Sequence, residues 1–239
     1  FLGMEPAVQP IPLQRLAVMF VPVFIVVVIQ IRWAISARSS VYAIGRMLLQ
    51  LMLIGYVLLF LFESEHAILV TLVLTVMITV SSWIALRPLA SARRSLYPIT
   101  LAAIAVSGLP MLFLATEWVL DVTPWYAPRV VIPLAGMIFA NAMNSVSIAA
   151  ERFSSELSAG LDRVEARRKA FEAALIPLVN SLLAVGLVAL PGMMTGQVLA
   201  GVSPLIAARY QILVMCMLFG SSGIAAACYL YWSRPPQSR

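Results

Sequence analysis

The sequence predicts an all-α membrane protein with about seven transmembrane helices, one of them interrupted by a Pro-Gly pair. Of the 239 residues, 62% are hydrophobic and only 11% are charged. A soluble domain of this size carries about 25% charged residues. Apolar runs recur along the chain, each close to the roughly 20 residues that a helix needs to cross a bilayer. We therefore expect a single transmembrane domain over residues 1–239 and no soluble domain.

The expected spans follow one another in chain order after a short N-terminal segment rich in proline and polar residues. They are residues 16–31, 41–62, 67–86, 98–118, 130–150, 175–202 and 205–232. Pro191 and Gly192 fall where the sixth span should still be helical, and proline breaks a helix by removing a donor and by clashing with the preceding turn. A broken helix within a bilayer must be buried in protein or line a water-filled cavity, where its free backbone groups find partners. Such a break is a usual sign of a transport site.

Basic residues are distributed unequally between the two sides of this topology. Seven spans place the termini on opposite sides, and 13 of the 16 Lys and Arg residues then fall on the side of the C-terminus. Because positive loops stay in the cytoplasm, we expect the N-terminus outside the cell membrane and the C-terminus inside. The segment 151–175 is then a cytoplasmic loop. Basic residues in these cytoplasmic loops explain the net charge of +6. We therefore expect membrane lipid as a partner and no nucleic acid.

Few residues could support catalysis or ATP binding. The only histidine, His66, lies in an outer turn, so no serine in a span has a histidine base. The only lysine, Lys169, follows Arg168, and a phosphate-binding loop requires lysine after a glycine-rich turn. We therefore expect no enzyme activity and no cofactor in this chain. If transport is driven by ATP, then ATP and Mg bind a separate ATPase subunit. The outer turn with Glu63, Glu65 and His66 is a weak candidate for a cation site, and a simple polar turn explains these residues better.

Amide and thioether side chains within the spans are candidates for a substrate pathway. Asn141 and Asn144 are three residues apart and share a helical face. Polar groups in a bilayer face other helices or a cavity, and thioethers are soft ligands for metals. The proposed pathway residues are Asn141, Asn144, Met137, Met143, Met193 and Met194. Two alternatives stay open, which are hydrogen bonds between helices for the amides and ordinary core packing for the methionines.

The charged segment before the sixth span is a candidate contact surface for an ATPase. From residue 161 to 174 it is rich in strong helix formers. The proposed coupling residues are Arg163, Val164, Arg167, Arg168, Lys169, Phe171 and Glu172. The alternative is a solvated basic helix, or one that lies on anionic lipid.

Several motifs resemble the FetB-type ABC permease family over nearly the whole chain from about residue 40. They are RMLLQL at 46–51, IPLAGM at 132–137, NAM at 141–143, ALIP at 174–177, LPGMMTG at 190–196 and YQI at 210–212. The resemblance implies a homodimeric permease that works with a separate ATPase subunit. Bacterial relatives are implicated in iron export and plant relatives in aluminium tolerance. Relatives have a longer loop with a Leu-Gly-Ala turn before the ALIP motif, and residues 165–171 lack that glycine here.

We therefore expect the membrane subunit of an ABC transporter that exports iron or another metal. One alternative is a permease of the same build for an organic or nucleotide-sugar solute. Another is an ion-driven carrier without an ATPase. Glu117, at the outer end of the fourth span, is the only acidic residue within an expected span. Because ion coupling generally uses acidic groups near the bilayer centre, this weighs against the carrier.

Overall fold

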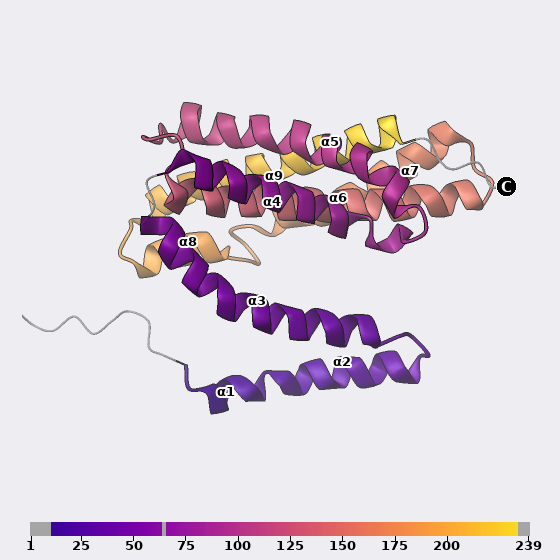
Figure 1. Cartoon of the computed structure of the whole chain (residues 1–239), viewed down its shortest axis with the longest axis horizontal. Coiled ribbons are helices and arrows are strands. Elements are labelled where there is room, and N and C mark those ends of the chain that lie inside the picture. Colours follow the sequence, from indigo (N-terminus) through magenta and orange to yellow (C-terminus); the bar gives the residue numbers. More distant parts are fainter. Residues whose placement is uncertain (1–10, 64–65, 234–239) are drawn as a thin grey trace, which may run out of the picture. The chain divides into compact units, whose positions relative to one another are not determined.

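The computed structural model describes residues 11–63 and 66–233, and every regular element within this part is a helix (Figure 1). Six of its helical stretches are long and apolar enough to cross a membrane. The all-α, multi-pass prediction is thus confirmed. The expected sixth span is absent from these six because its apolar residues are divided between the end of a 22-residue helix whose first half is charged and a helix of only 8 residues. Contacts group the chain into two units, residues 1–63 and 64–239.

The first unit holds the two expected N-terminal spans. Its helices are α1 (Leu13–Val18), α2 (Phe20–Arg32) and α3 (Arg38–Glu63). A turn with Ala34 at a φ of 56° joins α2 to α3. No residue is buried in the most apolar stretches of these helices, 14–32 and 38–59. Helices that are apolar on all sides and exposed to this extent are suited to contact with lipid.

The second unit is a helical bundle built around α6. Its elements are α4 (Ala67–Ala85), η1 (Arg87–Leu89), α5 (Arg93–Phe113), η2 (Leu114–Val119), α6 (Pro128–Ser158), α7 (Arg163–Ala184), α8 (Gly192–Leu199) and α9 (Pro204–Trp232). Helix α6 contacts α4, α5, α7 and α9, and Ile138, Ala142 and Val146 on it are fully buried. Small residues permit close approach of these helices. At Gly108 on α5, a Cβ would lie 2.6 Å from the Phe139 ring.

Basic residues gather at one end of the second unit. The α4–α5 turn, the α6–α7 turn and the end of α9 lie together at this end, the right-hand end in Figure 1. Arg163 Nη2, in the first turn of α7, donates to the carbonyl of Ser233 at 2.8 Å. Arg93, at the start of α5, lies 3.8 Å from the ring centre of Trp83 and donates to the Trp83 carbonyl. We name this region the basic end.

The charged segment 151–175, expected as a helix-prone cytoplasmic loop, is a helical hairpin. Helix α6 continues to Ser158 and α7 begins at Arg163. Asp162 caps α7, because its side chain accepts from the backbone N–H groups of Val164 and Glu165 at 2.8 and 3.0 Å. The strong helix formers of residues 161–174 and this cap favour a helix at this position, and the cytoplasmic location of the segment stays a prediction.

The expected interruption of the sixth span is present, but it begins before Pro191. Helix α7 ends at Ala184, whose carbonyl accepts from the N–H groups of Val188 and Ala189 at 2.8 and 3.1 Å. Gly186 follows with a φ of +80°, which closes a tight turn. Pro191 is the N-cap of α8, so it starts the next helix instead of kinking the previous one. We name residues 185–191 the break.

Candidate translocation and coupling sites

The break lies over a cavity of about 440 Å³ between α6, α7 and α9, which we name the break cavity. Its lining includes Met137, Asn141, Leu178, Pro191, Met193 and Gln211. A second cavity of about 590 Å³, the α8 cavity, is lined by residues that include Arg129, Met137, Met193, Gln197 and Tyr210. The two linings share Met137, Met193 and Val214. The cavities therefore adjoin, with the two thioethers at their junction.

Amide groups are the main polar feature of these cavities. Gln211 is buried, and its Oε1 has no hydrogen-bond partner among the described residues. The same holds for Gln197 Oε1 in the α8 cavity. An unpaired buried amide oxygen costs about 1–3 kcal/mol, so both groups favour a solute that brings a donor or a positive charge. The Nδ2 of Asn141 donates to the Met137 carbonyl at 2.9 Å, within its own helix rather than between helices.

The structure brings together some of the pathway residues expected from the sequence. Met137, Asn141 and Met193 line the cavities. Asn144 is exposed, and neither Met143 nor Met194 belongs to either lining. The sequence reasoning missed Gln211, although a glutamine inside an apolar span is itself a signal of a cavity or a helix contact.

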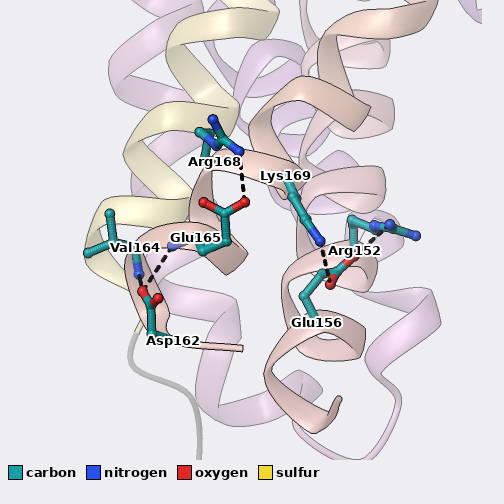
Figure 2. A network of polar contacts seen from close by, with 7 residues as sticks. All are labelled: Arg152, Glu156, Asp162, Val164, Glu165, Arg168 and Lys169. Carbon is teal, nitrogen blue, oxygen red and sulfur yellow. Dashed lines mark hydrogen bonds and ion pairs between the residues drawn. The ribbon is translucent and has the colours of Figure 1, made fainter. Parts of the chain in front are cut away.

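Ion pairs tie the two helices of the charged hairpin together. Figure 2 shows Glu156 of α6 between Arg152, on the same helix, and Lys169 of α7. Its Oε1 lies 2.5 Å from Arg152 Nη2, and its Oε2 lies 3.7 Å from Lys169 Nζ. Because the Glu156 side chain is buried, these cations compensate a charge that water does not solvate. The start of α7 is thereby held against the end of α6.

A second ion pair lies on the exposed face of α7. Arg168 Nη2 donates to Glu165 Oε1 at 2.8 Å, and this hydrogen bond, with the charge of Glu165, raises the pKa of Arg168. The guanidinium of Arg168 is therefore permanently cationic.

The coupling residues expected from the sequence fall into three groups. Val164, Arg168 and Glu172 are exposed, and Val164 reaches 74% exposure. Arg163 and Lys169 are engaged with Ser233 and Glu156. Arg167 and Phe171 line a cavity of about 530 Å³ beside the end of α9, and Val164 and Arg168 lie at the same cavity. The Arg167 guanidinium lies 5.6 Å from the ring centre of Tyr231.

The candidate cation site in the outer turn falls largely outside the described residues. Glu65 lies outside them, and so does the side chain of Glu63. His66 is exposed and precedes α4. Within residues 11–63 and 66–233, no group of three His, Cys, Asp or Glu side chains could hold a metal ion.

Comparisons with known proteins place this chain among membrane proteins. A family model described as "Uncharacterised protein family (UPF0014)" matches residues 13–235. The chain is 38% identical over 192 residues to the UPF0014 membrane protein slr1647 of Synechocystis, covering 74% of each chain. It is 31% identical over 241 residues to the probable iron export permease protein FetB of Escherichia coli, covering 94% of this chain and 91% of FetB. It is also 31% identical over 211 residues to the protein ALUMINUM SENSITIVE 3 of Arabidopsis thaliana, covering 81% and 76%. No solved structure matches.

Proposed function

This chain belongs to the UPF0014 family, and from that premise we propose that it is the permease subunit of an ABC transporter that exports iron or another metal. The resemblance to FetB-type permeases is confirmed by the match over 94% of the chain. The chain is a multi-pass membrane protein with six helical stretches suited to span a bilayer. The name of the relative, "probable iron export permease protein FetB", supports the same activity here.

The single observation that carries the proposal is the path of α7. Its first turns lie at the basic end, where Val164 and Arg168 are exposed to a partner. Its last turns, with Leu178 and Ser181, line the break cavity. A rigid helix that is displaced at one end also moves at its other end. Such a helix can therefore couple two sites.

The proposed partner is a separate ABC ATPase that carries ATP and Mg and contacts the exposed face of α7. The gathering of basic residues at the end that holds the α6–α7 turn supports a cytoplasmic location for this end. The N-terminus is then outside the cell membrane. We further propose that two copies of the chain form a homodimer, as the resemblance implies.

The proposed cargo is a metal that contacts the thioethers of Met137 and Met193. A second candidate, an organic or nucleotide-sugar solute, is favoured by a different observation. The described linings of both cavities contain amides and Arg129 but no carboxylate. Amides and a guanidinium bind polar organic groups well, whereas hard cations prefer carboxylates.

Reconstitution with an ABC ATPase tests the proposal. The purified pair is placed in proteoliposomes, and ATPase activity and metal movement are measured with Fe²⁺ and with a nucleotide sugar. We expect a stable complex whose ATPase is stimulated by the metal. The control is an ATPase that lacks its P-loop lysine. Stimulation by the nucleotide sugar alone would favour the second candidate, and transport without any ATPase would contradict both.

A further inference from the structure

A cavity separate from the proposed pathway surrounds Glu117, at the end of the second unit opposite the basic end. It measures about 460 Å³, within the range of ligand pockets. Its walls are Leu74, Leu109, Leu112, Phe113, Thr116 and Val131, with Trp125 beside them. Glu117 is the only charged residue in this lining. Its Oε1 is buried and has no hydrogen-bond partner among the described residues.

Glu117 lies on the face of the α5–η2 segment that borders this cavity. Leu109, Leu112, Phe113, Thr116 and Glu117 all line it, and residues three or four positions apart share one face of a helix. Glu117 itself belongs to the π-helix η2, residues 114–119, in which hydrogen bonds join residues five apart, as between Leu120 N–H and the Ala115 carbonyl at 3.1 Å. Single π turns of this kind are frequent at functional sites.

The chemistry of the lining selects one class of ligand. A buried carboxylate oxygen requires a positive or donating partner. A metal ion would need further ligands, and this lining contains no second carboxylate, histidine or cysteine. An ammonium group satisfies the carboxylate with a single charge-assisted contact. The indole of Trp125 attracts cations through its face, and the aliphatic walls accept an apolar body.

We propose that the Glu117 cavity binds the ammonium group of an amphipathic amine. The partner is the head group of phosphatidylethanolamine or a free organic amine, since both present the same cation beside an apolar chain. The location suits both a lipid head group and a free amphipathic amine, because Trp125 and the neighbouring Tyr126 form an aromatic pair of the kind found at membrane interfaces. This site is independent of the proposed pathway, since it shares no lining residue with either cavity of that pathway.

Lipid retention tests the head-group source. The full chain is released from nanodiscs of equal parts phosphatidylethanolamine and phosphatidylglycerol, and retained lipids are counted by native mass spectrometry. We expect Glu117→Gln to lower the ratio of retained ethanolamine to glycerol lipid by about tenfold, as for loss of a charged hydrogen bond. Glu151→Gln is the matched control, because Glu151 is exposed at the basic end. If Glu117→Gln fails to fold, Trp125→Leu is the second variant, since its side chain is exposed and its loss should also lower the ratio.

Protection of the carboxyl group tests the free-amine source. In nanodiscs of phosphatidylglycerol alone, a hydrophobic carbodiimide modifies Glu117, and peptide mass spectrometry follows the rate. We expect phenethylammonium to slow the modification several-fold, whereas the neutral 2-phenylethanol does not. Protection by the amine with unchanged lipid retention identifies a soluble ligand, and altered retention identifies the lipid. Equal retention by wild type and variant, with no amine-dependent change at Glu117, overturns the proposal.

Discussion

Lys169 on α7 lies 3.7 Å from the buried carboxylate of Glu156 on α6, and this pair joins the two helices of the charged hairpin (Figure 2). Lys169 is the only lysine of the chain. It lies in the same helix whose far end lines the break cavity. The pair therefore sets where α7 starts relative to α6, and through the helix it influences the position of the break.

Removing the carboxylate should loosen the hairpin. We expect Glu156→Gln to lower the free energy of unfolding by about 1–3 kcal/mol, because two cations lose a buried charged acceptor. Lys169→Met should cost less, about 0.5–1 kcal/mol, since its ammonium is partly exposed and screened. Unfolding in mixed micelles with increasing dodecyl sulfate measures both. Arg168→Gln is the control, because its partner Glu165 lies on the exposed face, and a loss there as large as at Glu156 would contradict this assignment.

The break depends on Gly186 more than on Pro191. Gly186→Ala should destabilise the protein by about 1–2 kcal/mol, since its φ of +80° is strained for any residue with a Cβ. No atom lies within 4 Å of the added Cβ, so the cost is conformational and not steric. Pro191→Ala should have a smaller effect, because α7 has already ended at Ala184. The same unfolding titration compares the two, and a larger loss at Pro191 would be inconsistent with this prediction.

Sulfur contact with the cargo can be tested at matched methionines. If the metal contacts thioethers, Met137→Leu with Met193→Leu should lower metal-stimulated ATPase activity by about tenfold, or about 1.4 kcal/mol. Leucine keeps the apolar volume and removes the sulfur. Met143→Leu with Met194→Leu is the control, because neither residue lines the break cavity or the α8 cavity. Equal activity of both double variants would favour a packing role for the methionines.

The exposed face of α7 should bind the ATPase. Val164→Asp with Arg168→Glu is expected to reduce co-purification of the ATPase at least several-fold. Thermal stability should fall only slightly, since both side chains are exposed and the lost Arg168–Glu165 pair lies at the surface. Phe171→Ala with Arg167→Glu should lower transport as well. That pair also loosens the contact with Tyr231, so its thermal stability should fall. Unchanged pull-down and unchanged ATPase in the first variant would leave this face as a lipid-facing basic surface.

Cysteine labelling should locate the basic end. In a background with Cys216 and Cys228 replaced by alanine, Thr123→Cys and Ser158→Cys probe the α5–α6 loop and the end of α6. An impermeant maleimide applied to intact cells should label residue 123 and leave residue 158 unlabelled until the membrane is opened. The reverse pattern would place the α6–α7 turn outside the cell.

The helical, membrane-spanning character of the chain follows from its sequence alone. Apolar runs of sufficient length can satisfy backbone hydrogen bonds in lipid only as helices or closed barrels, so composition and length predict α2 to α6 and α9 without knowledge of packing. The interruption near Pro191 was predicted from a Pro-Gly pair, and the contact role of the charged segment from its helix formers and charges. Both predictions depend on residues that are close together in the sequence, so they need no knowledge of packing.

Only the tertiary structure decided which of these residues meet. Asn141 and Asn144 share a face by spacing, yet the contacts of α6 with α7 and α9 place only Asn141 in the break cavity. Glu117 was recognised as an isolated acid, but only the packing of α4, α5 and α6 encloses it in a cavity with Leu74 and Val131. Gln211 is buried because α9 packs against α6. Such outcomes depend on helix rotation and register, which arise from packing between distant segments rather than from the residues of one helix.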